Sequence, residues 1–405
     1  MGFSVIASSP SLGLSGANVL VANLFDRLQK QGCRTEWLVT GHQSAADEAA
    51  WLGKRQFAIH RLPQTHVADF RRRQKLLCQF LEEHSPCVYL PNFDFDMACA
   101  IPALSPANKA VMIMHSDDPV YYDFMARHGN FFNATVCVSE FLTGRLQAAY
   151  PALRKRIVHI PFGVEPPSRL SARDKAEGQP LDVAYCGRIS FHQKRVQDLA
   201  AIIIQCHAQN LPVRFHIAGA GPDEMEFFAR IREPLAAGKA VRLGFLPNER
   251  VLQLMERSDV LLMTSEFEGL PVVLLEAMAC GCIPVVTRTE SGMTELVRDG
   301  ENGYLLPIGD VVSFVEALKG LIAEPNRRQQ LREAAYESIG AGGFTLERAA
   351  EDYQKLFSSL IRDDAKWAVS RNGEMIRPEH YDLIFRLRHK WEMLLNRFSN
   401  RSRPL

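Results

Sequence analysis

The stretch EGLPVVLLEAMACGCIPVV at residues 268–286 holds the pattern that repeats along most of this 405-residue chain. A loop with one glycine leads into an apolar helix start, and Gly281 then separates this helix from the β-branched run at 283–286. Similar aliphatic runs alternate with amphipathic stretches of about 10 to 15 residues elsewhere in the chain. The alternation is typical of βαβ units and predicts an α/β fold with doubly wound parallel sheets.

The predicted strands fall into two series. The first series lies at 4–7, 36–39, 87–90, 110–114, 134–138 and 157–160, and the second at 183–186, 215–218, 241–243, 260–263 and 283–286. Between the two series, residues 161–180 contain four prolines in polar and charged surroundings, which is typical of an interdomain hinge. We therefore expect two domains.

The composition excludes several classes of protein. The 47 Lys and Arg residues balance 46 Asp and Glu residues, which argues against bulk nucleic-acid binding. The nine cysteines are dispersed and mostly in apolar surroundings, as in reduced cytosolic proteins rather than in a disulfide framework or a cysteine zinc site. No apolar run reaches the about 18 residues of a membrane span, and the first residues lack a signal-peptide pattern. We expect a cytoplasmic protein.

Two glutamates form the strongest chemical feature. Glu268 lies in the loop and Glu276 inside the following helix, a spacing that suits two hydroxyl-bearing parts of one ligand. The backbone N–H groups at the helix start face the same space and favour a phosphate there. Taken alone, two such glutamates are more often a surface residue and a helix residue near the positive end of the helix dipole.

The whole segment resembles the E-x7-E motif of glycosyltransferase family 4, the retaining group 1 transferases of GT-B fold, as do the downstream residues 291–297 and 299–303. The resemblance implies two Rossmann-like domains facing across a cleft: an acceptor-binding domain at 1–165 and a nucleotide-sugar donor-binding domain at 166–345. It also implies that C-terminal helices in 346–405 cross back towards the first domain.

Two cations follow the first strand of the second series. Arg188 and Lys194 come after Gly187, where the chain can turn out of the strand, and both can converge on one anion. Such a pair neutralises a diphosphate leaving group, as a metal ion would otherwise do. Arg and Lys in a loop are commonly just solvated, but the spacing here is similar to that of the family's phosphate-binding pair.

The resemblance implies further roles for motif residues. Glu268 would orient the transferred sugar and Glu276 would hold the ribose. The expected donor-binding residues, drawn from glycine loops at strand ends and from the motif itself, are Gly16, Gly187, Gly219, Gly221, Phe245, Leu246, Gly269, Leu270, Pro271 and Glu276. A glycine pair such as Gly219 and Gly221, taken alone, more often forms a tight turn than a ligand site.

The N-terminal half contributes a histidine and a glycine loop. His115 ends a predicted strand where the family carries a His beside the transferred sugar, so it joins Glu268, Arg188 and Lys194 as a candidate catalytic residue. A lone His at a strand end is also commonly structural, and both roles stay open. The loop 13–18 resembles the family's glycine loop, although Asn18 stands where an acidic residue is frequent.

The sequence Asp94-Phe95-Asp96 has the form of the D-x-D metal signature of the other large transferase fold, GT-A. Oxygen ligands for Mg²⁺ would normally gather at the donor diphosphate, and this segment is far in sequence from the donor motifs. We therefore expect an acceptor-side loop, together with Asn18 and Asp117, and no metal or other cofactor. Activity lost on chelation would support the metal alternative.

The last residues lie outside the resemblance, which ends near Leu360. Residues 379–398 form an amphipathic, basic stretch that suits either a helix docked on the N-terminal domain or a helix on anionic lipid. We favour docking, and keep peripheral contact with the inner face of the membrane as the alternative.

The expected function is that of a retaining, metal-independent hexosyltransferase. It would move a sugar from a nucleotide-sugar donor, UDP-linked rather than GDP-linked, to a glycan, lipid-linked or small-molecule acceptor in bacterial polysaccharide or glycoconjugate biosynthesis. Alternatives are a catalytically silent nucleotide-sugar-binding protein and a GT-B epimerase that converts the nucleotide sugar without an acceptor.

Overall fold

The computed structural model describes residues 2–12, 16–41, 55–63, 70–170, 178–363, 365–376 and 378. The chain divides into two compact units: unit 1 is Met1–Phe162 with Leu346–Leu405, and unit 2 is Gly163–Thr345. These divisions fall within three residues of the sequence-based limits at 165 and 345. The hinge segment 171–177, the loop residues 13–15 and the basic stretch 379–398 lie outside the described residues.

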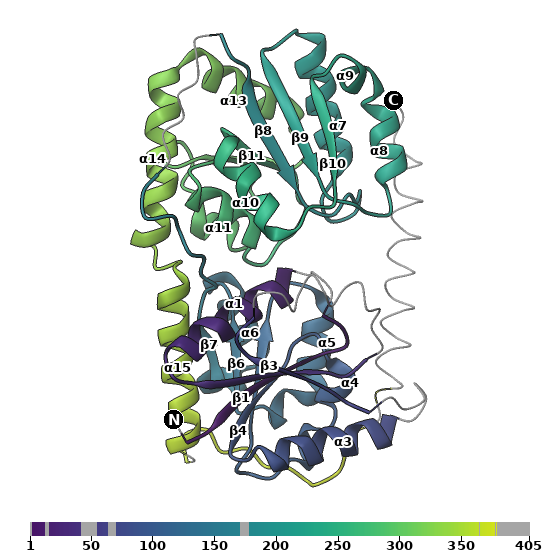
Figure 1. Cartoon of the computed structure of the whole chain (residues 1–405), viewed down its shortest axis with the longest axis vertical. Coiled ribbons are helices and arrows are strands. Elements are labelled where there is room, and N and C mark those ends of the chain that lie inside the picture. Colours follow the sequence, from purple (N-terminus) through teal and green to yellow (C-terminus); the bar gives the residue numbers. More distant parts are fainter. Residues whose placement is uncertain are drawn as a thin grey trace. The chain divides into compact units, whose positions relative to one another are not determined.

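Unit 1 is built on a seven-stranded sheet with the order β3-β2-β1-β4-β5-β6-β7 (Figure 1). All neighbouring strands pair in parallel. The strands are β1 (Ser4–Ser9), β2 (Arg34–Val39), β3 (Ala58–Arg61), β4 (Cys87–Pro91), β5 (Lys109–Met114), β6 (Ala134–Cys137) and β7 (Ile157–His159). Strand β3 was not predicted, because its sequence AIHR has neither an apolar run nor an alternating pattern.

The helices of unit 1 are α1 (Gly16–Lys30), α3 (Phe70–Glu83), α4 (Phe95–Ala98), α5 (Pro119–His128), α6 (Glu140–Ala149) and α15 (Leu346–Arg362). Helix α15 packs against α1 and buries one face that includes Tyr353, Phe357 and Leu360. Beyond it, the carbonyl oxygen of Trp367 accepts a hydrogen bond of 2.8 Å from Asn133. The chain thus returns from unit 2 to complete unit 1.

Unit 2 is built on a six-stranded parallel sheet with the order β10-β9-β8-β11-β12-β13. Its strands are β8 (Leu181–Cys186), β9 (Val213–Ala218), β10 (Ala240–Gly244), β11 (Val260–Met263), β12 (Ile283–Thr287) and β13 (Tyr304–Leu306). Its helices are α7 (Val196–Ala208), α8 (Glu224–Arg230), α9 (Arg232–Ala236), α10 (Asn248–Arg257), α11 (Val272–Ala279), α12 (Met293–Leu296), α13 (Val311–Ala323) and α14 (Pro325–Ala341).

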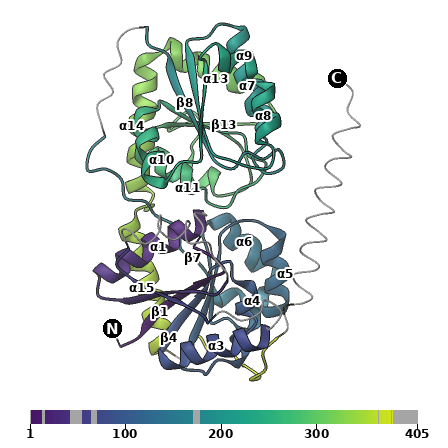
Figure 2. The same cartoon turned by 45° about the vertical axis from the view of Figure 1, so that its right-hand side comes forward.

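Helices cover both faces of the second sheet, with α7 and α8 on one side and α10 and α11 on the other (Figure 2). The strands carry almost continuous buried apolar residues, such as Leu262 and Val285, as expected for parallel strands covered on both faces. The prediction of two Rossmann-like parallel sheets is therefore confirmed.

Each sheet reverses its strand order at one point, between β1 and β4 in unit 1 and between β8 and β11 in unit 2. Ligands of doubly wound sheets bind outside the carboxyl ends of the strands at such switch points.

Among the described residues, no helix is long and apolar enough to cross a membrane.

Candidate functional site

The switch point of unit 2 holds an ion pair between two sequence-predicted residues. Lys194 lies in the loop after β8 and Glu268 in the loop after β11, and their Nζ and Oε1 atoms are 2.5 Å apart. Both side chains are largely buried, with 16% and 8% of their surface exposed. The two loops are joined by further bonds, because Thr264 donates to the Lys194 carbonyl oxygen at 2.8 Å and Glu266 N donates to that of Gln193 at 2.8 Å.

Arg188 begins the same loop as Lys194 and has an exposed side chain. Its guanidinium makes no hydrogen bond or ion pair with the part of the chain that the structure describes, whereas its carbonyl oxygen accepts a 2.7 Å bond from the buried Tyr185 hydroxyl. The backbone is thus anchored while all the guanidinium donors stay available for an anion.

Backbone contacts hold the glycine loops after β8 and β9 together. Gly187 N donates to the Ala218 carbonyl oxygen at 3.0 Å. Gly219 has a φ of 142°, and a Cβ added there would lie 1.8 Å from the Gly187 carbonyl oxygen. A Cβ at Gly221 would lie 2.1 Å from the carbonyl oxygen of Ile189. Glycine is therefore required at both positions for the two loops to approach so closely.

Glu276 lies on α11 and is buried, with 8% of its surface exposed. Its Oε1 accepts a 2.7 Å hydrogen bond from Nδ2 of Asn248, the first residue of α10. Burial raises the pKa of Glu276 to about 7, although the bond from Asn248 lowers it. Asn248 was not among the predicted site residues, because it begins α10 directly after the loop of Phe245 and Leu246 and belongs to no named motif.

The segment between Glu268 and Glu276 is held by a hydrogen bond from the loop that follows β12. The Gly269 carbonyl oxygen accepts a 2.7 Å bond from Gly292 N, and a Cβ at Gly292 would lie only 2.7 Å from that oxygen. Leu270 is buried, and no side chain caps the N-terminus of α11 at Pro271. The first N–H groups of this helix are thus not used by a capping side chain.

The loop after β10 places its two predicted residues differently. Phe245 is 59% exposed, which is unusual for a large apolar side chain, whereas Leu246 is partly buried and lines a surface hollow with His216 and Arg250. Of these two residues, Phe245 is therefore the one whose side chain is largely exposed to solvent.

In unit 1, a chain of side-chain amides fixes the state of His115. Asn18 Nδ2 donates to the Ser11 carbonyl oxygen at 3.2 Å, Asn92 Nδ2 donates to Asn18 Oδ1 at 2.8 Å, and His115 Nε2 lies 2.7 Å from Asn92 Oδ1. Because a carbonyl oxygen can only accept, each amide orientation follows and Nε2 must carry the proton. His115 Nδ1 is then an acceptor, and it has no partner among the described residues.

Two phenyl rings sandwich His115. Phe93 and Phe162 stack on it with centroid distances of 5.1 and 5.4 Å and interplanar angles of 14° and 13°. Burial lowers the pKa of His115 to about 3, so the imidazole is neutral at pH 7. Phe93 has a positive φ of 54°, a strained conformation for this residue type at the end of β4. Sequence reasoning did not identify Asn92 or Phe93, because they meet His115 only through the pairing of β4 with β5.

The acidic residues expected on the acceptor side are already engaged. Asp94 is buried, and its Oδ2 accepts 2.7 Å hydrogen bonds from Ser8 and Thr40. Burial raises the pKa of Asp94 to about 6. Asp117 accepts a 2.6 Å bond from the Tyr122 hydroxyl and pairs with Arg145.

These contacts argue against direct binding of an acceptor by Asp94, which instead ties together the ends of β1 and β2. Asp96 lies in the first turn of α4 and is partly buried. Among the described residues, Asp94 and Asp96 do not belong to any group of three potential metal ligands.

Gly16, expected to contribute to donor binding, is exposed at the first position of α1.

Comparison with known families decides the affiliation of the chain. Residues 169–338 match the family model of the group 1 glycosyl transferases, and residues 14–167 match that of glycosyltransferase family 4. The chain belongs to these glycosyltransferases. Each unit of this family member therefore carries its own family match, which confirms the resemblance found in the sequence.

Individual relatives of this family member come from bacterial sugar metabolism. The putative colanic acid biosynthesis glycosyltransferase WcaL of Salmonella typhimurium is 31% identical over 196 residues, which are 47% of each chain. The lipopolysaccharide 1,6-galactosyltransferase of Escherichia coli is 35% identical over 150 residues, 36% of this chain and 41% of the relative. The chain thus spans about half the length of the curated relatives it matches.

Solved structures share the fold of this family member at low sequence identity. Staphylococcus aureus TarM, in a complex with fondaparinux, alpha-GlcNAc-glycerol and UDP, has a TM-score of 0.73 at 12% identity, over 88% of this chain and 100% of TarM. HepE of Anabaena in complex with UDP has a TM-score of 0.70 at 16% identity, over 89% of this chain and 100% of HepE.

Proposed function

We propose that this protein is a retaining hexosyltransferase that uses a nucleotide-sugar donor, UDP-linked rather than GDP-linked. Unit 2 would bind the donor and unit 1 the acceptor, which we expect to be a glycan, a lipid-linked sugar or a small molecule. The relatives named for colanic acid and lipopolysaccharide biosynthesis support a place in bacterial polysaccharide or glycoconjugate synthesis. The site would then work in the cytoplasm, with peripheral membrane contact as a further possibility for residues 379–398.

The observation that carries this proposal is the Lys194–Glu268 pair, because the loop that holds Lys194 also carries Arg188, whose exposed guanidinium has no partner among the described residues. An ammonium group has three donors, and Glu268 Oε1 uses one of them. Lys194 can therefore fix the Glu268 carboxylate and still donate to a phosphate oxygen. Arg188 would add charge-assisted bonds to the same diphosphate, whose negative charge grows as the sugar departs.

The two glutamates would hold the two ends of the donor. Glu268 has a second carboxylate oxygen for sugar hydroxyls, and the buried Glu276 would accept hydrogen bonds from the ribose. Asn248 fixes the rotamer of Glu276 through the bond to Oε1. Phe245, exposed at the next loop, offers an apolar face for the base. His115 Nδ1, held as an acceptor by Asn92, would receive a hydrogen bond from a sugar hydroxyl.

The reaction would proceed on one face of the sugar. The bond from the anomeric carbon to the diphosphate breaks, the acceptor oxygen attacks from the same side, and its proton passes to the departing phosphate oxygen. We assign no side chain as a covalent nucleophile, so the leaving group itself serves as the base. Lys194 and Arg188 would stabilise that leaving group without a metal ion.

Turnover with a panel of UDP and GDP sugars, with and without candidate acceptors, tests the proposal. Formation of an α- or β-linked product with the donor's anomeric configuration, unaffected by EDTA, is the expected result. Donor converted to an epimer without acceptor would indicate an epimerase, and tight donor binding with no conversion would indicate a catalytically silent protein.

A further inference from the structure

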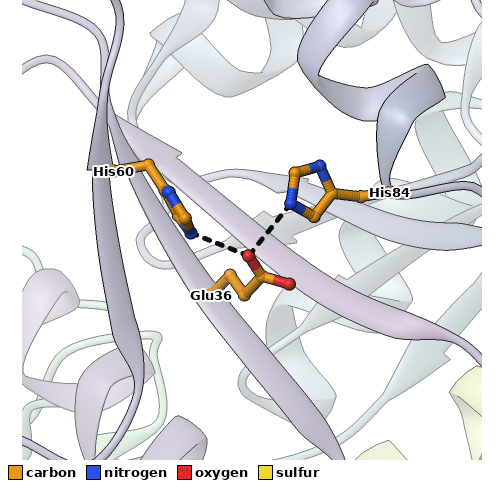
Figure 3. A group of neighbouring side chains, drawn as sticks. All are labelled: Glu36, His60 and His84. Atoms are coloured by element: carbon orange, nitrogen blue, oxygen red, sulfur yellow. Dashed lines mark hydrogen bonds and ion pairs between the residues drawn. The ribbon is translucent and has the colours of Figure 1, made fainter.

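A cluster outside the donor site brings together one carboxylate and two imidazoles. Glu36 Oε2 lies 2.8 Å from His60 Nε2 and 3.2 Å from His84 Nε2. In Figure 3 both rings point at this one oxygen from different elements. Within the described part of the chain, this is the one group of three potential ligands whose ligand atoms all lie within 4.8 Å of one another.

The fold builds this cluster from three separate elements of unit 1. Glu36 pairs with Ala58 in the sheet register, and Leu38 pairs with His60, so Glu36 and His60 occupy one face two residues apart. His84 follows directly after α3. This helix lies on the same face, because the Phe80 ring contacts His60 and stacks on His84 with centroid distances of 5.0 and 4.2 Å.

Hydrogen bonding defines what His84 presents to Glu36. His84 Nδ1 is 2.7 Å from the carbonyl oxygen of Phe80, which can only accept, so Nδ1 carries a proton. A neutral His84 then directs the lone pair of Nε2 at a carboxylate oxygen, which is unfavourable unless a proton or a metal ion is bound there. An imidazole that donates its other N–H to a backbone carbonyl is the usual state of a histidine bound to a metal.

The remaining contacts also suit a metal ion. Arg34 Nε is 2.7 Å from Glu36 Oε1 in an ion pair that lacks hydrogen-bond geometry, and Arg34 itself is 67% exposed. Glu36 and His84 are 2% and 15% exposed, whereas His60 is 36% exposed and leaves a path to solvent. Ligand atoms bound about 2.0 to 2.1 Å from a tetrahedral ion lie about 3.3 Å apart, close to the 3.2 Å between His84 Nε2 and Glu36 Oε2. The 2.8 Å between His60 Nε2 and the same oxygen is a hydrogen-bond distance and would lengthen when the ion binds.

We propose that Glu36, His60 and His84 form a binding site for a divalent transition-metal ion, with Zn²⁺ as the ion and water as the fourth ligand. Two imidazoles and one carboxylate suit Zn²⁺ and disfavour Mg²⁺, which prefers oxygen ligands. The site lies over the middle of β2 and β3, whereas Asn92 and His115 directly follow the carboxyl ends of β4 and β5. Its role is therefore to fix edge strand β3 and helix α3 onto the sheet, not to act on the donor.

Titration of the full-length metal-free protein with ZnCl₂, followed by calorimetry and thermal unfolding, tests the site. We expect one Zn²⁺ per chain and a rise in Tm of roughly 5 to 10 °C at a hundred-fold excess over Kd. CoCl₂ should give the visible absorption of a four-coordinate ion with nitrogen and oxygen ligands, and MgCl₂ should give no shift.

Variants assign the ion to these side chains. His60→Ala and His84→Ala should each weaken Zn²⁺ binding at least roughly ten-fold and abolish the cobalt spectrum. The matched control is His216→Ala, because His216 also pairs with a carboxylate, Asp182 at 2.8 Å, but joins no group of three potential metal ligands among the described residues. Circular dichroism of each variant confirms folding, and the solvent-exposed His60 position keeps that risk low.

Zinc bound equally by wild type and by both cluster variants would overturn the proposal, and so would a folded wild-type protein that binds no Zn²⁺. In the second case the two histidines would be imidazolium partners of Glu36. The proposal is independent of donor chemistry: brief EDTA treatment should lower the Tm while leaving initial turnover unchanged.

Discussion

Glu276 is buried and has Asn248 as its one hydrogen-bond partner among the residues that the structure describes, which makes it a titrating group of the proposed donor site. Burial raises its pKa to about 7, far above the ordinary value for glutamate near 4.3. In the proposed role, an ionised Glu276 would accept hydrogen bonds from ribose hydroxyls with both oxygens and more strongly than the protonated form. The free protein therefore favours the protonated form, and a bound nucleotide would favour the charged form.

The free energy of unfolding should fall by roughly 3 kcal/mol as the pH rises from about 4 to 8, since the unfolded chain loses this proton before the folded chain does. Affinity for UDP should rise over pH 6 to 8, because Glu276 of the folded protein becomes ionised in this range. Glu276→Gln should flatten both profiles and weaken UDP binding, as measured by urea unfolding and calorimetry. The exposed Glu316→Gln serves as the control, and an unchanged pH profile in Glu276→Gln would contradict the assignment.

The amide chain at His115 permits a second prediction at this scale. Asn92→Asp would replace the Nδ2 donor to Asn18 by an oxygen and place a negative charge beside the imidazole. The pKa of His115, about 3 in the native protein, should rise by roughly 1 to 3 units. Ring-nitrogen NMR should show a neutral Nε2–H tautomer from pH 5 to 8 in the native protein. Observation of Nδ1–H, or of a charged ring at pH 7, would refute the amide orientations given above.

At the scale of elements, the loops after β8 and β9 pack directly against each other because Gly219 and Gly221 have no side chains that would keep them apart. The sequence could indicate that these loops border a ligand, since each follows a strand of a doubly wound sheet. It could not indicate that Gly219 and Gly221 face the carbonyl oxygens of Gly187 and Ile189, because such contacts depend on the pairing of β8 with β9.

Gly219→Ala should therefore be strongly destabilising. The φ of 142° alone costs roughly 1 to 3 kcal/mol for a residue with a Cβ, and the collision with the Gly187 oxygen adds to it. Gly320→Ala, in the open interior of α13, should instead stabilise by roughly 0.5 to 1 kcal/mol. Chemical denaturation of both variants checks the pair, and equal effects would show that the loop contact is unimportant.

The same limit explains the elements that sequence reasoning missed. Asn248 and Asn92 carry no local pattern, and each acquires its partner only when separate strands and helices come together. The short edge strand β3 gave no periodic signal, so the cluster of Glu36, His60 and His84 could not be foreseen. By contrast, Lys194 and Glu268 lie in motifs that are recognisable without coordinates.

At the scale of the whole molecule, the two units depend differently on chain continuity. Unit 2 is one continuous segment, Gly163–Thr345, with its own core, whereas unit 1 needs α15 and the residues that follow it. That the units face one another across a cleft, and that the N-terminal domain binds the acceptor, stay predictions. The alternation of strands and helices was enough to foresee two parallel sheets, because most of the strands and helices show that pattern in their own sequence.

A chain that ends at residue 345 should thus lose unit 1 and keep unit 2. Removing α15 takes away its contact with α1 and the buried side chains of Tyr353, Phe357 and Leu360, which is far more apolar area than a domain of marginal stability can lose. Calorimetry should show the unfolding transition of unit 2 alone, and UDP should still raise its midpoint. Two intact transitions would show that unit 1 folds without α15.

The central claim is that Arg188 and Lys194 together bind the diphosphate of the donor. Calorimetric titration of UDP and of uridine into the native protein and into the Arg188→Gln/Lys194→Gln double variant isolates the phosphate contribution. Two lost charge-assisted contacts of roughly 1.5 to 3 kcal/mol each should weaken UDP binding at least roughly a hundred-fold and leave uridine binding within a factor of about three. Undiminished UDP affinity in the double variant, or an equal loss for uridine, would contradict it.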